Sequence, residues 1–133
     1  APAVQERVAA EAASVDLSPD AAARAVDRLP LTRAVVQEAL RLYPPAFTIV
    51  RMAKGADEIA GEAVPAGSLV VMAPWILHRH RRRWDHPERF DPTRFVPGAP
   101  PIDRFAYLPF GAGPRVCIGQ AFAQTETVAI ALT

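Results

Sequence analysis

The distribution of proline and glycine constrains the fold of this chain more than any other feature. The 133 residues include 14 prolines and 7 glycines, many of them spread through the second half. Proline has a fixed φ and no backbone N–H, so it interrupts helices and central strands. We expect helices early in the chain, followed by short strands, turns and irregular backbone.

The spacing of apolar residues predicts which segments are helical. Leu31, Val35, Ala39 and Leu42 form an apolar stripe on the third expected helix, which Pro44-Pro45 would end. After Phe47, short runs rich in Val and Ile predict strands. The prediction is a mainly α chain with small β-sheets (α+β) in one domain: helices at 3–15, 19–27 and 31–42, short strands at 47–73, one or two helical turns at 74–80, an irregular meander and cysteine loop at 81–117, and a helix at 118–133.

Charge and hydropathy exclude several classes of partner. Fifteen Lys and Arg residues against 14 Asp and Glu residues leave a formal net charge of +1, which creates no field to attract nucleic acid or an anionic membrane. Apolar stretches such as residues 68–77 are too short to cross a bilayer, and the single cysteine excludes an internal disulfide. We expect a cytoplasmic protein without a membrane segment. Because the chain begins at Ala1 rather than Met, we also expect a piece of a longer polypeptide.

The segment from Phe110 to Gly119 carries the most specific chemistry in the sequence. Two glycines and a proline precede Cys117 and permit a tight loop whose backbone N–H groups can point at the sulfur. Cys117 also lies where a helix is expected to begin, and the positive end of a helix dipole favours thiolate over thiol. Two alternatives remain open: a buried thiol in an ordinary Gly/Pro turn, and a zinc site made by Cys117 with His78, His80 and His86.

This segment resembles the haem-binding loop of the cytochrome P-450 family of haem-thiolate monooxygenases. The family signature Phe-x-x-Gly-x-Arg-x-Cys-x-Gly is matched by Phe110, Gly113, Arg115, Cys117 and Gly119. The resemblance implies that Cys117 is the metal ligand to the iron of haem b, that Arg115 pairs with a haem propionate and that Phe110 packs beside the sulfur. Thiolate ligation pushes electron density onto iron and favours O–O cleavage. The cofactor-binding residues that it implies are Arg51, Phe110, Gly111, Gly113, Arg115, Cys117, Ile118, Gly119 and Ala123.

A pair of charges on the third expected helix resembles a second family motif. Glu38 and Arg41 are three residues apart, so they project from the same helix face. In the family, this Glu-x-x-Arg closes a buried structural triad with the arginine of a later Pro-x-Arg-Phe element. Two elements compete for that place, and position relative to the preceding aromatic and acidic residues favours Arg94 over Arg89, which would then lie on the surface.

The resemblance also implies roles for residues before the loop. Arg51 would pair with the second propionate, although an ordinary charge at a strand edge is an alternative. Independently of the resemblance, the charge of the basic run at 78–83 predicts either a solvated face or a docking surface for an acidic electron-transfer partner. Nucleic-acid binding is disfavoured, because no aromatic residues are interleaved with the run. The expected wall of the substrate pocket comprises Ala46, Phe47, Thr48 and Ile49.

The resemblance covers only the C-terminal part of the cytochrome P-450 fold, which is therefore incomplete in this chain. It implies an oxidoreductase that uses O2, takes electrons from a ferredoxin or flavin reductase and inserts oxygen into an apolar small molecule. No catalytic residue is expected in this segment, because the family's distal acid and alcohol lie on a helix that precedes it. Two alternatives remain: a non-catalytic fragment, and a haem-thiolate peroxygenase or isomerase.

Overall fold

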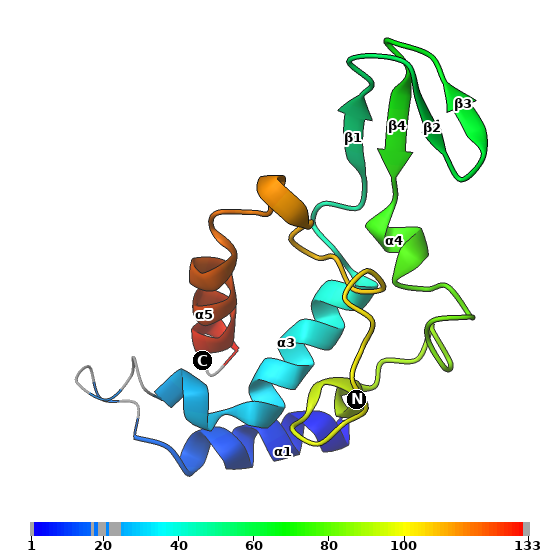
Figure 1. Cartoon of the computed structure of the whole chain (residues 1–133). Coiled ribbons are helices and arrows are strands. Elements are labelled where there is room, and N and C mark those ends of the chain that lie inside the picture. The colour runs from blue at the N-terminus through cyan, green and yellow to red at the C-terminus, as the bar shows by residue number, and fades with distance from the viewer. Residues whose placement is uncertain (1, 17, 19–20, 22–24, 132–133) are drawn as a thin grey trace.

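The computed structural model describes residues 2–16, 18, 21 and 25–131 (Figure 1). Within this part of the chain, the expected α+β class, mainly α with small sheets, is confirmed. No helix among the described residues is long and apolar enough to cross a membrane. The regular elements are α1 (Pro2–Ala13), α3 (Pro30–Leu42), β1 (Ile49–Met52), β2 (Asp57–Ile59), β3 (Glu62–Val64), β4 (Leu69–Met72), α4 (Pro74–Leu77) and α5 (Gln120–Ile130), with 3-10 turns at Val26–Arg28, Pro92–Phe95 and Gly113–Arg115.

The helix ends differ in detail from the expected ranges. α1 ends at Ala13 rather than residue 15, because the N–H and the hydroxyl of Ser14 both donate to the Glu11 carbonyl and close a turn. α5 begins at Gln120 rather than residue 118, because Gln120 N–H donates to the Cys117 carbonyl across a turn (3.3 Å). The helix expected at 19–27 lies largely outside the described residues, and its end overlaps the turn Val26–Arg28.

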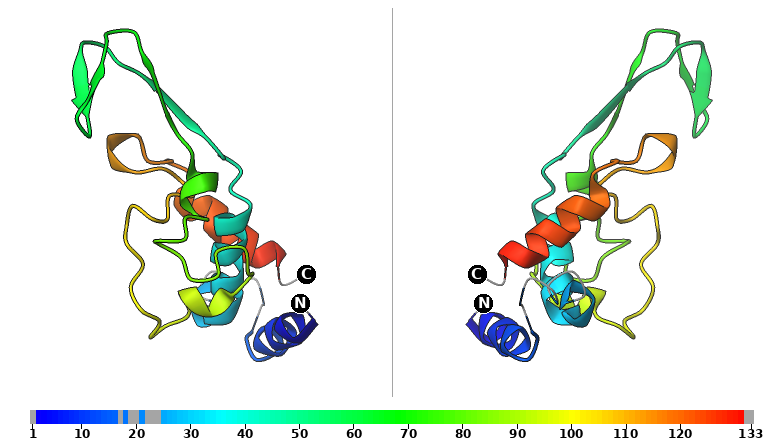
Figure 2. Two further views of the ribbon diagram at one scale, coloured as in Figure 1. Left: turned by 90° about the vertical axis from the view of Figure 1, so that its right-hand side faces the viewer. Right: turned by 90° about the vertical axis from the view of Figure 1, so that its left-hand side faces the viewer.

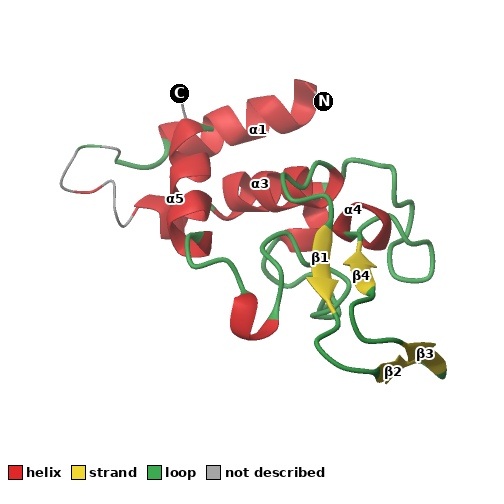
Figure 3. Ribbon diagram, turned by 90° about the horizontal axis from the view of Figure 1, so that it is seen from above, coloured by secondary structure: helices red, strands yellow, loops and turns green. Residues whose placement is uncertain are grey.

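α3 lies at the centre of the helical part. It contacts α1, α5 and the turn Pro92–Phe95, and α1, α3 and α5 lie together on the side opposite the strands (Figures 1 and 3). This central position explains a partial error in the expected apolar stripe: Val35 and Ala39 are only half-buried. The residues of α3 that are buried occupy more than one face: Leu31, Thr32, Ala34, Val36, Glu38, Arg41 and Leu42. The apolar core joins Leu29 and Val36 to Val128 of α5.

The strands form two antiparallel pairs on an arm that projects from the helices (Figure 2). β1 pairs with β4, with Arg51 opposite Val70, and β2 pairs with β3. Ala60 (φ 53°) and Gly61 (φ 86°) connect β2 to β3, and two positive φ values in succession suit the right-handed twist of a tight hairpin. Most residues of these strands are exposed, so the arm contributes little to the core.

The amino end of α3 is capped by a carboxylate from α1. Glu11 Oε1 accepts from the N–H of Leu31 (2.8 Å), and Glu11 Oε2 accepts from the N–H and the hydroxyl of Thr32 (2.7 Å each). The first N–H groups of a helix lack partners within it, and a negative charge there is further stabilised by the helix dipole. Glu11 therefore joins α1 to N–H groups of α3 that lie 20 and 21 residues later in the chain.

We expect Glu11→Ala to lower the free energy of unfolding of the full-length protein by roughly 1–3 kcal/mol, because it leaves buried N–H groups without acceptors. Urea unfolding measures the change. The matched control is Glu6→Ala, which removes an exposed glutamate from the same helix and should change stability by less than about 0.5 kcal/mol. Equal effects of the two substitutions would contradict a capping role for Glu11.

Candidate functional site

A buried ion pair on α3 holds the irregular stretch that follows α4. The side chains of Glu38 and Arg41 are both 0 % exposed, and Arg41 Nε and Nη2 lie 2.7 and 2.8 Å from the two carboxylate oxygens of Glu38. The other guanidinium hydrogens point to the carbonyl oxygens of His78 and Pro87 (2.7 Å each) and of Arg89 (3.1 Å). All five donors of Arg41 are therefore used, and three of them hold loop backbone.

Of the two arginines that compete for the triad, the structure brings Arg94 to Glu38. Arg94 Nε lies 3.6 Å from Glu38 Oε1, an ion pair too long to be a hydrogen bond, and its Nη2 donates to the carbonyl of Asp85 (2.6 Å). The N–H of Asp91 completes the surroundings of the carboxylate (2.8 Å). Arg89 contributes only its carbonyl oxygen, and its side chain is exposed. The three charges thus form one cluster beneath the irregular stretch.

We expect Arg94→Ala to destabilise the full-length protein by roughly 1–3 kcal/mol, because backbone carbonyls lose a charged donor and Glu38 loses a second cation. Arg89→Ala is the matched control, with an expected change within about 0.5 kcal/mol. Urea unfolding and haem retention are the measurements. If the two variants behaved alike, Arg94 would have no special place in the triad.

His78 is a structural residue that the sequence analysis missed. It was assigned to the positive run or to a zinc site, yet its side chain is 0 % exposed. Its Nδ1 lies 3.1 Å from the carbonyl oxygen of Arg41, and its Nε2 lies 2.8 Å from the N–H nitrogen of Leu108. Burial lowers the pKa of His78 to about 4. With both ring nitrogens engaged, His78 is not available to zinc, and the described residues contain no group of three or more His, Cys, Asp or Glu side chains placed for a metal ion.

An aromatic cluster also holds the irregular stretch against α3. The Tyr107 ring centroid lies 5.3 Å from that of His78 and 4.9 Å from that of Phe95, and Trp84 completes the cluster. The guanidinium of Arg41 lies over the Trp84 ring at 4.9 Å. The Tyr107 hydroxyl donates to the Gln37 carbonyl of α3 (2.9 Å), and burial raises the pKa of that phenol. These contacts explain how a stretch without regular elements keeps one conformation.

The loop before α5 presents Cys117 to solvent. Gly111 (φ 76°) and Gly113 (φ 73°) adopt backbone angles that other residues rarely take, and they turn the chain toward the cysteine. The N–H of Cys117 donates to the Phe110 carbonyl (2.9 Å), which closes the loop. The thiol is exposed, so the alternative of a buried cysteine is wrong. No N–H donor to the sulfur is found among the described residues, and the N–H groups of Gly111, Val116 and Cys117 donate to carbonyl oxygens instead.

The surroundings of the sulfur fit a flat apolar group that carries carboxylates. Val116 and Ile118, which flank Cys117 in the chain, are 46 % and 104 % exposed, and Phe122 on α5 is 71 % exposed. A Cβ at Gly119 would lie 3.8 Å from Cys117 Sγ, so a side chain there would narrow the approach to the sulfur. Arg115 is exposed, and no carboxylate of the described residues pairs with it. An exposed thiol, apolar side chains and a free guanidinium together suit a thiolate-ligated haem.

The other predicted site residues lie on β1, on α5 and in the segment before β1. A Cβ on Gly111 would lie 3.7 Å from Ile49 Cδ1, so the expected pocket wall and the cysteine loop are neighbours. Arg51 is exposed on β1, where its Nη1 donates to the Val50 carbonyl (2.9 Å). Ala46 is exposed, and Ala123 is half-buried on α5. Phe47 and Thr48 line an apolar groove with Tyr43, Pro44, Ala73, Trp75 and Ile76.

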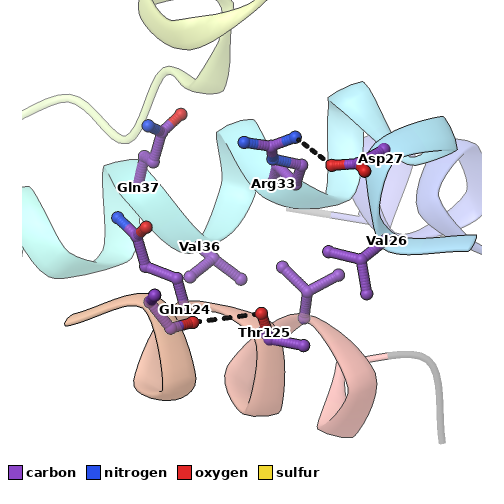
Figure 4. Close-up of a pocket in the computed structure, with 9 residues that line it drawn as sticks. Val26, Asp27, Arg33, Val36, Gln37, Gln124 and Thr125 are labelled. Atoms are coloured by element: carbon purple, nitrogen blue, oxygen red, sulfur yellow. Dashed lines mark hydrogen bonds and ion pairs between the residues drawn. The ribbon is translucent and has the colours of Figure 1, made fainter. Parts of the chain in front are cut away.

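A second pocket lies between α3 and α5 and is lined by more polar side chains (Figure 4). It contains the ion pair between Arg33 and Asp27 (3.2 Å) and the side chains of Gln37 and Gln124. None of the residues expected to hold haem or substrate lines it. This pocket is therefore separate from the candidate site.

Comparison with known proteins points to one family. The family model described as Cytochrome P450 matches residues 1–133. Cyclooctat-9-en-7-ol 5-monooxygenase of Streptomyces melanosporofaciens is 38 % identical over 133 residues, 99 % of this chain and 29 % of that protein. Pentalenene oxygenase of Streptomyces avermitilis is 41 % identical over 105 residues (77 % and 23 %), and thromboxane-A synthase of Sus scrofa is 47 % identical over 92 residues (68 % and 17 %). The chain thus spans less than a third of these relatives, at 17 to 29 % of their length. The resemblance carried by the loop from Phe110 to Gly119 is confirmed, and this chain belongs to the cytochrome P450 family.

Proposed function

We propose that the whole protein is a haem-thiolate monooxygenase in which Cys117 binds the iron of haem b. The observation that carries the proposal is the exposed thiol of Cys117 in a glycine-containing loop flanked by exposed apolar side chains. Two of the similar proteins bear the names monooxygenase and oxygenase, which supports the same class of reaction. Haem held by a thiolate supplies the activation of O2 that such a reaction needs.

The residues of this chain would hold that group from one side. Arg115 and Arg51 would each pair with a propionate, since both guanidinium groups are exposed. Phe110 would pack beside the sulfur, and Gly119 would allow close approach because it has no Cβ. Ala123 would present a small side chain to the macrocycle.

The substrate in this proposal is an apolar small molecule. Ile49 adjoins the cysteine loop at Gly111, and Phe47 and Thr48 belong to a groove whose lining is mainly apolar. Residues 46–49 would therefore form one wall of the substrate pocket.

The electron donor in this proposal is an acidic ferredoxin or flavin reductase. Not every residue of the positive run at 78–83 would be available to bind this donor. His78 is buried, Arg79 donates to the Leu42 carbonyl, and Arg83 pairs with Asp103 (2.9 Å). Among the described residues, the exposed members of this run that form no ion pair with a carboxylate are His80, Arg81 and Arg82. We place the protein in the cytoplasm in this proposal, because the single cysteine of the chain is consistent with a reducing compartment.

The reduced carbon monoxide difference spectrum of the full-length protein tests the haem-thiolate part of this proposal. We expect the band that is characteristic of thiolate ligation. NADPH-dependent oxygenation of an apolar substrate in the presence of a reductase tests the monooxygenase part. Absence of bound haem would remove the whole proposal, whereas turnover that needs only peroxide, or that rearranges an oxygenated lipid without reductant, would assign a peroxygenase or an isomerase.

A further inference from the structure

A buried histidine joins the carboxyl end of α3 to the segment that leads to Cys117. The last four carbonyl groups of a helix have no partner within it. His78 and Arg79, which directly follow α4, supply such partners for α3. Nδ1 of His78 lies 3.1 Å from the Arg41 carbonyl oxygen, and Nη2 of Arg79 donates to the Leu42 carbonyl. One ring nitrogen of His78 is thereby committed to α3.

The other ring nitrogen of His78 faces the cysteine loop. The N–H of Leu108 donates to His78 Nε2 (2.8 Å), and the carbonyl of Leu108 accepts from the N–H of Gly111 (3.2 Å). Phe110, between these two residues, accepts from the N–H of Cys117 (2.9 Å). The side chain of His78 is therefore linked to Cys117 through the backbone of the segment from Leu108 to Gly111.

We propose that His78 is a positioning residue for the Cys117 sulfur, holding the loop from Leu108 to Cys117 against α3 as a neutral imidazole. Nδ1 carries the proton, because a carbonyl oxygen only accepts, and Nε2 is then free to accept from Leu108. The consequence at the sulfur rests on the proposed haem-thiolate function, whereas the hold on the loop is a property of the polypeptide alone.

The groups around His78 favour the neutral form. Burial lowers its pKa to about 4 even though the hydrogen bond to the Arg41 carbonyl acts to raise it, and the guanidinium groups of Arg41 and Arg79 add to the lowering. The carboxylate of Glu38 is paired with Arg41, and the phenol of Tyr107, whose pKa burial raises, stays uncharged. A proton on Nε2 would remove the acceptor of the Leu108 N–H. When the loop opens, His78 regains its ordinary pKa of 6.5. Acidification from pH 6.5 toward pH 4 therefore favours the open loop, and the contribution of His78 to stability is lost as the pH falls through this window.

Hydrogen–deuterium exchange of the full-length protein, with and without haem, tests this role. His78→Leu removes both hydrogen bonds, whereas His78→Gln keeps an oxygen that can accept from Leu108 and does not titrate. His80→Gln is the matched control, because His80 is exposed and two residues away. At neutral pH we expect residues 108–117 to exchange roughly 10- to 100-fold faster in His78→Leu. The Gln variant and the control should stay within about threefold of wild type.

The pH profile separates positioning by a neutral imidazole from a merely structural role. After correction for intrinsic rates, exchange of residues 108–117 relative to α5 should rise in wild type as the pH falls below 6.5, and should stay flat in His78→Gln. If His78→Leu does not fold, this comparison still decides. A flat wild-type profile, or faster exchange spread equally over α5, would overturn the proposal.

The haem-loaded protein adds a readout at the sulfur. At pH 5, the thiolate-type carbon monoxide band should be lost faster in wild type than in His78→Gln. A wild-type protein with no thiolate band but with the expected exchange behaviour would remove the haem-thiolate function and leave the loop-holding role of His78. A normal band with unchanged exchange in His78→Leu would remove the role of His78 alone.

Discussion

Replacing Cys117 by serine is expected to abolish the thiolate-type carbon monoxide band of the full-length protein. The thiol is the single sulfhydryl of the chain, and it is exposed at the mouth of the loop before α5. A neutral hydroxyl cannot supply the electron density that a thiolate gives to iron. The difference spectrum of the reduced protein is the measurement, and we expect complete loss of the band with the fold retained.

Ala112→Ser is the matched control for this substitution. It places a hydroxyl in the same loop at an exposed position with extended backbone angles, so the loop need not change. The band should persist in this variant. If Cys117→Ser kept an unchanged band, the axial ligand would have to be another residue, and the assignment of the cysteine loop would be wrong.

Arg41→Ala is expected to cost roughly 3–5 kcal/mol in the free energy of unfolding, because it leaves the buried carboxylate of Glu38 without its bidentate partner. The same change removes the donors to three loop carbonyls, those of His78, Pro87 and Arg89. Urea unfolding of the full-length protein and its haem content are the measurements. Arg41→Lys should also be strongly destabilised. An ammonium group lacks the planar fork of five donors with which Arg41 contacts Glu38 and the three loop carbonyls.

Arg33→Ala provides the comparison for Arg41→Ala on the same helix. Arg33 forms an ion pair with Asp27, but its side chain is 49 % exposed and that of Asp27 82 %, so the pair should contribute less than about 1 kcal/mol. If Arg41→Ala lost no more stability than Arg33→Ala, the buried cluster around Glu38 would not be what holds the irregular stretch that follows α4.

Local patterns were sufficient to predict the elements whose residues contact their sequence neighbours. α3 was expected at 31–42 and extends from Pro30 to Leu42, because a proline favours its first turn and Pro44-Pro45 prevents its continuation. Short strands between turn residues were likewise expected within residues 47–73, whereas the pairing of β1 with β4 and of β2 with β3 was not predicted. The cysteine loop could be recognised because the residue types and spacing that ligation requires all lie within ten positions.

Contacts between distant segments were not predictable from those patterns. Nothing local to Glu11 indicates that its carboxylate caps a helix twenty residues later, and nothing local to His78 distinguishes it from the exposed His80. The two half-buried positions of the expected stripe on α3 have the same cause, because partners from α1, α5 and the meander surround this helix.

The sequence by itself determined the family, the axial cysteine as a prediction, and the regular elements, because helix periodicity, turn chemistry and a contiguous motif depend on residues near one another in the chain. Only the tertiary structure decided which buried groups satisfy one another. It gave both ring nitrogens of His78 a partner and brought the Glu11 carboxylate to the first N–H groups of α3. The place of Arg94 beside Glu38, in contrast, was already favoured by its position in the sequence. The physical reason is that a buried polar group needs a hydrogen-bond partner, and this partner can come from a segment far away in the chain. Local sequence patterns do not indicate which distant segment the fold brings close.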